Sequence, residues 1–324
     1  MSATKGLTNI ETQHNDMIHD SQFDYYGRKL ATCSSDRTIK IFDVTDGMHH
    51  HSATLTGHEG PVWQVAWAHP KFGVILASCS YDGSVIIHRE NPPKTWNNIY
   101  RHEERASMNS IAWAPHEHGL VLAAASSDGR VTIIEHLEDQ WVTSSFQNDN
   151  LGTNAVSWAP FGAIGSFPTT SSSSSSSNSD NNLPCRRLVT ASCDKIVRIW
   201  RCNGTSYNNT TNNNNNNEWI EENKDSNTSP HSDWVRDVQW APNTAMPYNI
   251  IASCSEDTKV VIWTQDSANK PWTCKVMHTF PAPVWRLSWS LSGNILAVST
   301  GDHKVSLWKH TVDESWINIS TVTE

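Results

Sequence analysis

Three side chains of the kind that build a hydrolase lie close together in the second half of the chain: His231, Ser253 and Asp257, followed by Trp263. A serine with a histidine base and a carboxylate can perform nucleophilic acyl transfer. Parts of the set recur, however, as His58, Ser78, Asp82 and His88, and again as His14, Thr32, Asp36 and Phe42. A set that repeats along the chain is typical of a buried hydrogen-bond network that rigidifies a repeated unit. We therefore predict a structural network and no catalytic residues.

Other candidates for chemistry are weaker. Three consecutive histidines, His49 to His51, have a metal-binding side chain, but we expect them in a loop without fixed geometry. Cys33, Cys79 and Cys254 each stand three residues before an aspartate, which predicts one small buried slot that repeats. The sequence holds no Cys-x-x-Cys pair for zinc and no glycine-rich phosphate loop. We predict no metal site and no cofactor.

Composition narrows the possible partners. The 324 residues carry 24 Lys and Arg against 33 Asp and Glu, a net charge of −9. This sign disfavours direct binding of nucleic acid, and the scattered basic residues disfavour direct binding of anionic lipid. The first residues have no apolar core of a signal peptide, so we expect the seven cysteines to be reduced thiols in a cytosolic or nuclear protein.

A repeat that is anchored on aspartate predicts the strands that hold these side chains in place. Six aspartates are each preceded by a short run of small apolar residues and followed, six residues later, by Phe42, His88, Ile134, Trp200, Trp263 or Trp308. These aspartates are Asp36, Asp82, Asp128, Asp194, Asp257 and Asp302. Asp-Gly pairs at 82–83 and 128–129 are strong hairpin signals. A second mark lies upstream of each aspartate, at Phe23, Trp67, Trp113, Trp158, Trp240 and Trp289.

The repeat predicts four strands in about 45 residues, which is typical of a propeller blade. We expect fourth strands near 52–56, 96–100, 141–146, 219–222, 272–278 and 316–322. The 16 tryptophans then all fall on strands, where we expect them to act as wedges between blades. The predicted divisions of one domain, 1–324, are 7–51 for blade 1, 52–101 for its outer strand and blade 2, 102–147 for blade 3, 148–230 for blade 4, 231–280 for blade 5 and 281–324 for blade 6.

Blade 4 departs from the repeat. The second mark and the aspartate are 13 to 17 residues apart in five units but 36 apart in the fourth. Serines 171–177 and their flanks supply the added length. Asparagines 212–217 lie in a second long stretch, from Trp200 to Trp240, which spans 40 residues where the other units have 24 to 26. Such polar tracts of low complexity predict disordered surface insertions, here over 163–183 and 203–217.

The number of strands leaves the closure of the ring open. Six units each have a fourth strand of their own, yet 7–13 adds a further strand-like segment before the first inner strand. Six complete blades without strand exchange predict an open ring with two bare faces, which a partner blade would cover. The other interpretation is that 7–13 is a frayed tail and that six blades close directly.

Long blocks of the sequence are recognisable. The segments 24–42, 57–73, 231–240, 262–266 and 289–294 resemble, in register over nearly the whole chain, the Sec-thirteen family of WD-repeat propellers. The literal Trp-Asp pair is absent, and the two polar tracts and the N-terminal extension depart from the family pattern.

This resemblance implies an open six-bladed propeller, all-β, that is completed by a seventh blade from an elongated helical partner. In the outer COPII coat of ER-to-Golgi transport, the implied partner is a Sec-thirty-one type protein. In the nuclear pore scaffold it is a helical nucleoporin, and a nutrient-signalling complex is a third assembly. The implied location is cytoplasmic, peripheral on the endoplasmic reticulum membrane and on COPII vesicles, and at the nuclear pore, with membrane association indirect through the coat.

Two classes of function remain. For a non-enzymatic scaffold that takes a partner blade between blades 1 and 6, we expect apolar contacts from Ile18, Phe23, Trp285, Leu287, Ile317 and Ile319. The alternation of the strands leaves the face of each side chain open. The alternative is a closed propeller that binds peptides on its loops, as ubiquitin-ligase adaptors do.

Overall fold

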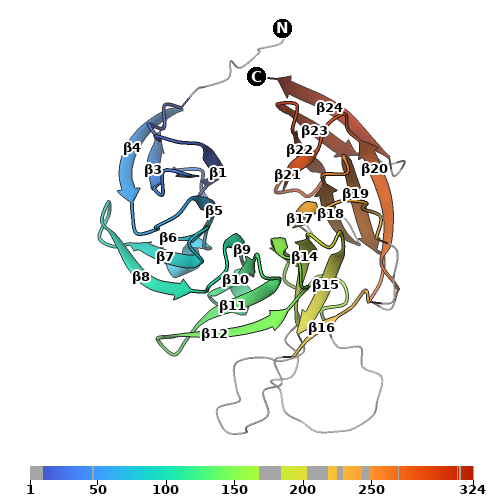
Figure 1. Cartoon of the computed structure of the whole chain (residues 1–324), viewed down its shortest axis with the longest axis horizontal. Helices are drawn as coiled ribbons and strands as arrows, with labels where there is room; N and C mark the ends of the chain where they lie inside the picture. The colour runs from blue at the N-terminus through green and yellow to red at the C-terminus, as the bar shows by residue number, and fades with distance from the viewer. Residues whose placement is uncertain are drawn as a thin grey trace, which may run out of the picture. The chain divides into compact units, whose positions relative to one another are not determined.

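The computed structural model of the protein describes residues 10–45, 47–167, 184–202, 218–224, 229–242, 248–268, 270–311, 313 and 315–323. The chain forms two compact units, Met1–Asn109 and Ser110–Glu324. It contains six four-stranded sheets, and in each sheet strands that are consecutive in the chain are neighbours (Figure 1). This confirms the prediction of an all-β protein built from six propeller blades, whereas the seventh blade from a partner stays a prediction.

The first unit holds the first two blades. Blade 1 consists of β1 (Ile18–Phe23), β2 (Lys29–Ser34), β3 (Ile39–Thr45) and β4 (Met48–Leu55). Blade 2 consists of β5 (Val62–Trp67), β6 (Ile75–Ser80), β7 (Ser84–Glu90) and β8 (Trp96–Glu103). A 3₁₀ turn, Pro70–Phe72, lies between β5 and β6.

The second unit holds the remaining blades, although β9 begins two residues before the division between units. Blade 3 consists of β9 (Met108–Trp113), β10 (Val121–Ser126), β11 (Arg130–Leu137) and β12 (Gln140–Gln147), with a 3₁₀ turn at His116–His118. Blade 4 consists of β13 (Thr153–Trp158), β14 (Arg186–Ser192), β15 (Val197–Cys202) and β16 (Trp219–Glu221). Blade 5 consists of β17 (Val235–Trp240), β18 (Asn249–Ser255), β19 (Lys259–Gln265) and β20 (Thr273–Thr279). Blade 6 consists of β21 (Val284–Trp289), β22 (Ile295–Thr300), β23 (Lys304–His310) and β24 (Trp316–Thr323).

The repeated aspartate closes the turn between the second and third strands. In blade 2, Asp82 Oδ1 accepts hydrogen bonds from the backbone N–H of Ser84 at 2.8 Å and from its hydroxyl at 2.6 Å. Gly83 has a φ of +80°, and a Cβ there would lie 2.2 Å from the carbonyl oxygen of Glu104. A side chain at position 83 would therefore collide with the backbone, whereas the same turn position in blades 1, 4, 5 and 6 holds Arg37, Lys195, Thr258 and His303 at positive φ.

Tryptophans join neighbouring blades, as the sequence predicts. At the end of its inner strand, Trp67 donates its indole N–H to the carbonyl of Gln22 in blade 1 at 2.9 Å. Trp158 does the same to Ala112 of blade 3 at 2.9 Å, and Trp289 to Gln239 of blade 5 at 3.1 Å. The indole therefore packs beside the preceding blade and also donates a hydrogen bond to one of its backbone carbonyls.

The inner strands contain an irregularity that simple alternation does not reveal. In the inner strands of blades 1, 2, 4, 5 and 6 the register shifts between the first and third residues: Ile18 to Asp20, Val62 to Gln64, Thr153 to Ala155, Val235 to Asp237 and Val284 to Arg286. An extra residue at such a bulge changes the face on which the following side chains lie.

Some predicted segments fall partly outside the described residues. Within the strand-like segment 7–13, residues 7–9 lie outside them, and 10–13 carry no strand. Of the predicted insertions, 168–183 and 203–217 also lie outside. The first residues of the former are packed, since Ala163 is fully buried in the core of blades 4 and 5.

Candidate partner interface

The Ser, His and Asp side chains of blade 5 form one buried chain. His231 Nδ1 lies 3.2 Å from Asp257 Oδ2, and its Nε2 lies 2.8 Å from Ser253 Oγ. Ser253 Oγ also accepts the indole N–H of Trp263 at 2.9 Å. An ionised Asp257 accepts a hydrogen bond from the Nδ1–H of His231, so the serine hydroxyl donates to Nε2, and every group is satisfied.

The electrostatics of this chain fit a structural role. Burial alone would raise the pKa of Asp257, but the hydrogen bonds from His231 and from the backbone N–H groups of Ser232 and Lys259 outweigh it. They hold the pKa of that carboxyl well below its ordinary value. Ser253 and the His231 side chain are fully buried, so no substrate reaches the hydroxyl.

Related chains recur in other blades. In blade 2, His58 lies 2.8 Å from Ser78 and 3.3 Å from Asp82, and in blade 1 His14 lies 2.8 Å from Asp36. Blade 4 has an equivalent that the sequence analysis missed. There the amide oxygen of Asn148 accepts from Thr190 Oγ1 at 2.6 Å and from Trp200 Nε1 at 3.0 Å. An amide in place of the imidazole concealed this network, although the threonine and tryptophan stand at the expected spacing.

The three consecutive histidines are not in a loop, so that prediction is wrong. All three belong to β4, opposite Phe42, Asp43 and Val44 of β3. Side chains alternate between the faces of a strand, so His50 points away from His49 and His51. They therefore cannot converge on one ion, and the described residues contain no group of three His, Cys, Asp or Glu that could hold a metal.

The inner strand of blade 1 differs in exposure from the inner strands of the other blades. Its equivalents bury their first and fourth residues: Val62 and Val65, Met108 and Ile111, Thr153 and Val156, Val235 and Val238, Val284 and Leu287. In β1 the corresponding Ile18 is 42% exposed and Ser21 is exposed, while Phe23, at the tryptophan position, is 54% exposed. One face of β1 thus presents apolar side chains without the cover that the other blades have.

The outer face of blade 6 is the second uncovered surface. Val305 is 42% exposed, and its cross-strand neighbour Val322 is 41% exposed. Ile317, opposite Lys309 on the same face, and Ile319 are each 46% exposed. Cross-strand partners share a face of the sheet, so Val305, Val322 and Ile317 form an apolar strip along β23 and β24, and Ile319 stands at the register shift of β24 beside it.

Two predicted contact residues lie elsewhere. Leu287 is 5% exposed and packs in the core between blades 5 and 6, so the prediction that it contacts a partner is wrong for this face. The bulge between Val284 and Arg286 turns its side chain toward blade 5. Trp285 is 41% exposed but stacks on Arg236 of blade 5, 5.2 Å from the guanidinium to the ring centroid. It belongs to β21, the edge strand opposite β24.

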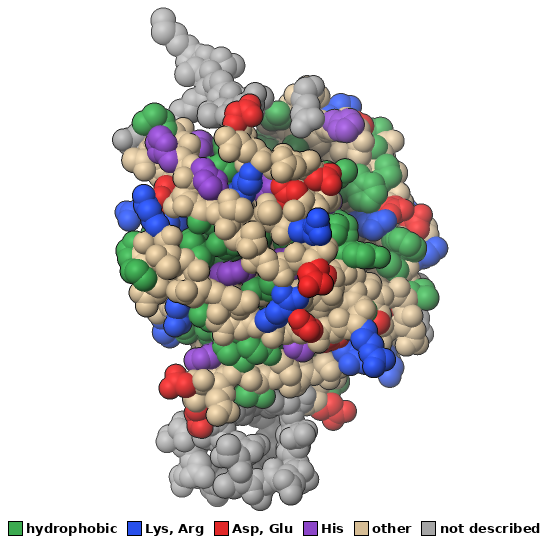
Figure 2. All heavy atoms as spheres, turned by 60° about the vertical axis from the view of Figure 1, so that its left-hand side comes forward, with side chains coloured by type: hydrophobic (Ala, Val, Ile, Leu, Met, Phe, Trp, Pro, Cys, Tyr) green, Lys and Arg blue, Asp and Glu red, His purple; other side chains and the backbone are tan. Residues whose placement is uncertain are grey.

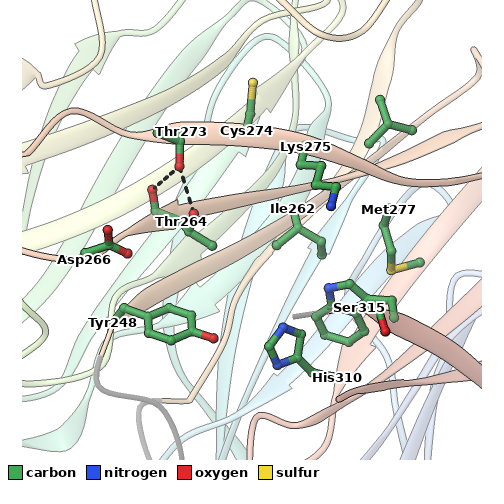
Figure 3. A pocket seen from close by; sticks show the side chains of 12 residues that line it. Tyr248, Ile262, Thr264, Asp266, Thr273, Cys274, Lys275, Met277, His310 and Ser315 are labelled. Carbon is green, nitrogen blue, oxygen red and sulfur yellow. Dashed lines mark hydrogen bonds between the residues drawn. The ribbon is translucent and has the colours of Figure 1, made fainter. Parts of the chain in front are cut away.

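A cavity of about 580 Å³ lies between blades 5 and 6 at the level of β20 and the end of β23. Tyr248, Lys275 and Met277 point into it, whereas the thiol of Cys274 points away from His310 (Figure 3). Burial also raises the pKa of that thiol, which keeps it protonated and a poor nucleophile.

Surface charge on the described residues is mixed. Figure 2 shows acidic, basic and apolar side chains interspersed over the face that it draws. No helix among the described residues is long and apolar enough to cross a bilayer.

Comparison with known proteins identifies the family. A family model described as "WD domain, G-beta repeat" matches residues 7–43, 50–89, 224–264 and 274–309. Another, described as "Anaphase-promoting complex subunit 4 WD40 domain", matches residues 74–160. The chain is 47% identical to the protein transport protein SEC13 of Yarrowia lipolytica over 321 residues. This alignment covers 98% of the chain and 100% of the relative. The chain belongs to the SEC13 family.

Other SEC13 relatives agree. The SEC13 homolog of Dictyostelium discoideum is 49% identical, covering 97% of this chain and 98% of the relative. The SEC13 homolog of Drosophila melanogaster is 43% identical, covering 97% and 83%. Membership of this family confirms the resemblance seen in the sequence and supports a role related to protein transport.

Proposed function

We propose that this SEC13-family chain is a non-enzymatic scaffold subunit of the outer COPII vesicle coat. It accepts a β-blade from an elongated helical partner of the Sec-thirty-one type, which packs on the exposed face of β1 and on the outer face of blade 6. The same surfaces serve a helical nucleoporin in the nuclear pore scaffold and a partner in a nutrient-signalling complex. The chain works in the cytoplasm, on the endoplasmic reticulum membrane and vesicles, and at the nuclear pore, and reaches membranes only through the coat.

The observation that carries the proposal is the pair of uncovered apolar faces. Ile18 and Phe23 on β1, and Val305, Ile317 and Ile319 on blade 6, are between 42% and 54% exposed. Contiguous exposed apolar surface on a sheet marks an interaction site. Addition of strands from a partner also satisfies the free backbone groups of an edge strand such as β24.

The absence of enzymatic activity is part of the proposal. The Ser253, His231 and Asp257 chain is buried and consists of satisfied structural hydrogen bonds. The net charge of −9 disfavours direct contact with nucleic acid.

The test is purification of the native chain from cells with its partners, followed by mass spectrometry and limited proteolysis of the main partner. We expect one or more long helical proteins in stoichiometric amounts, each held by a short β-rich segment. The double variant Ile317→Asp/Ile319→Asp should release them. The matched control, Val142→Asp/Val276→Asp, places the same charges on exposed strand positions of blades 3 and 5 and should leave the complex intact.

A second candidate, a receptor for short peptides, is favoured by one observation. Trp234 and Trp285 are 44% and 41% exposed and enclose Arg236, whose guanidinium lies 5.0 and 5.2 Å from their rings. Trp234, which directly precedes β17, is the kind of aromatic loop residue expected of such a receptor, whereas Trp285 lies within β21. If the chain is recovered alone, or with ligase subunits and many substoichiometric clients, this function replaces the scaffold.

A further inference from the structure

One block of the sequence is not explained by the fold. In the segment 24–28, Tyr25 is 68% exposed and Tyr26 is 62% exposed, in the loop between β1 and β2. The core does not use either ring. Two large aromatic side chains in adjacent exposed positions are a surface feature that needs its own account.

The two rings belong to a cluster that spans two blades of the first unit. The Tyr25 ring packs edge-on against Tyr26 and against His69, which lies in the loop between β5 and β6, with centroids 5.1 Å apart in both pairs. Arg28 lies over the Tyr26 ring at 5.6 Å, and Lys71 lies over Phe72 at 5.7 Å. These contacts hold the cluster in place before any partner binds, which reduces the entropy lost on binding.

The cluster has the opposite charge from the chain as a whole. Among the described residues at this end of blades 1 and 2, the basic side chains are Arg28, Lys29, Lys71, Arg89 and Lys94, and the acidic ones are Asp24, Asp43 and Glu90. The protein overall carries a net charge of −9. With Asp46, which the sequence places between β3 and β4, five basic residues stand against four acidic ones, so this end has a small excess of positive charge in an acidic protein.

The acidic side chains of this region are already engaged. Asp24 Oδ1 accepts from the backbone N–H groups of Arg28 and Lys29 at 2.6 and 2.9 Å. Asp43 and Glu90 both bind the ammonium of Lys29, at 2.9 and 3.2 Å. In the described part of the chain no ion pair uses Arg28 or Lys71, and both side chains are exposed. Two cations thus remain available beside two tyrosines.

We propose that Tyr25, Tyr26, Arg28, His69 and Lys71 form a second docking surface, which binds an acidic segment of a protein partner. Tyrosine and arginine are enriched among the residues that dominate binding energy at protein interfaces, and the rings supply area at a low entropy cost. The free cations select Asp or Glu in the partner. A membrane surface is a poorer fit, because polybasic lipid-binding segments use roughly four to eight cations.

This surface does not require the partner blade of the proposed function. It lies on loops at the end of the blades, whereas the blade would pack on strand faces. Because the two surfaces use different residues, either can fail in experiment while the other stands.

The test begins with photo-crosslinking of the full-length chain in cells, with benzoylphenylalanine at position 25 or 26. The matched control is position 81, where Tyr81 is 64% exposed in the turn between β6 and β7, at the other end of blade 2. We expect crosslinks from 25 and 26, but not from 81, to one peptide segment that contains several Asp or Glu residues. Crosslinks to a segment without acidic residues, or none above the level of position 81, overturn the proposal.

The second step measures binding of a synthetic peptide with the crosslinked sequence to the purified full-length chain. Arg28→Glu/Lys71→Glu, and separately Tyr25→Ala/Tyr26→Ala, should each weaken it about tenfold or more, as loss of hot-spot side chains does. The control Arg105→Glu reverses an exposed cation elsewhere in the first unit and should leave binding unchanged. Melting temperatures establish that all variants fold.

Two further probes distinguish the sources of negative charge. A peptide with Asn and Gln in place of Asp and Glu should bind about tenfold more weakly. Vesicles of phosphatidylcholine with 30% phosphatidylserine should not bind the chain. If they bind, and Arg28→Glu/Lys71→Glu abolishes that binding while the peptide is unaffected, the surface recognises lipid and the proposal is wrong.

Discussion

Blades 5 and 6 carry almost the same side chains on the face directed away from the preceding blade, but the solvent exposure of these side chains differs. In blade 5, Ile250, Ala252, Cys254, Val260 and Ile262 are at most 6% exposed and pack against blade 6. The equivalent residues of blade 6 are Ile295, Ala297, Ser299, Val305 and Leu307, all partly or largely exposed. Blade 6 thus has the composition of a blade interface without a blade on it.

This comparison teaches that apolar composition and burial are separate properties. A core-like face costs solubility when it stays bare, and the partner blade that we propose would remove that cost by covering it. The inner strand of blade 1, β1, shows the same separation of composition and burial. Its exposed Ile18 and Phe23 occupy positions that the inner strands of other blades bury or partly bury.

The largest expected effect comes from placing one charge at the same position of both blades. Val260 is fully buried, so Val260→Asp should cost about 4 kcal/mol or more and leave little folded protein, because an unpaired carboxylate is buried. Val305→Asp in blade 6 should cost less than about 1 kcal/mol in the isolated chain. Chemical denaturation of both variants measures the difference. Equal losses would mean that the outer face of blade 6 is covered in the free protein.

The next prediction exchanges the hydrogen-bond networks. Blade 6 has Val298 where blade 5 has Ser253, and its Trp308 donates to Ser306 at 2.9 Å instead. Ser253→Val removes the partner of both His231 and Trp263 and should cost about 2–4 kcal/mol. The double variant Ser253→Val/Val261→Ser gives the indole a new acceptor and should recover part of that loss in denaturation experiments. No recovery would mean that the two blades position their tryptophans differently.

A third prediction concerns pH and compares blades 1, 2 and 5. At one equivalent position they have Phe42, His88 and Trp263. Burial lowers the pKa of His88 to about 4, so the folded protein keeps it neutral where the unfolded chain binds a proton. Its contribution is present above the ordinary pKa of about 6.5 and is lost as pH falls toward 4.

At pH 5 this histidine should therefore make the chain about 2 kcal/mol less stable than at pH 8. His88→Phe, which installs the blade 1 residue, should remove that part of the pH dependence, as melting at both pH values would reveal. The acid loss due to Asp36, Asp82 and Asp257 should remain, because hydrogen bonds outweigh burial and hold all three pKa values below the ordinary range. Their contribution is present above about pH 4 and fades below it. An unchanged profile in His88→Phe would contradict the assignment.

The smallest expected effect sharpens the comparison of the blades by removing what is peculiar to blade 4. Deleting serines 171–177 and asparagines 212–217, which lie outside the described residues, should leave partner binding unchanged. The described ends of both insertions are tied by Arg187, which donates to Glu222 Oε1 at 2.9 Å and to the carbonyl of Ile164 at 2.5 Å. Loss of partner binding in a quantitative pull-down would show that these tracts form an interface.

Most of the strands could be predicted from the sequence, because the aspartate turn and the tryptophan at the end of the inner strand each occupy a fixed place in a blade. Side-chain direction in the inner strands could not, since the bulge at Trp285 breaks the alternation that would have placed Leu287. The β4 histidines were misplaced because polar His49 to His51 lack a strand pattern, although β3 pairs with them. Asn148 was missed because its amide does the work of an imidazole. Which faces stay bare depends on cover, which no local pattern of residues encodes.

The closed base of the first insertion has a consequence for how this sequence changes over generations. The backbone N–H of Cys185 donates to the carbonyl of Ser166 at 2.7 Å, so the two ends of the segment between them are held together. Once the ends are fixed, doubling the length of a flexible loop costs only about 0.6 kcal/mol. Insertions and deletions between Ser166 and Cys185 should therefore persist over generations with little effect on the stability of the chain. The segment between Ser166 and Cys185 should for the same reason accept the insertion of a fluorescent or affinity module whose own termini lie close together.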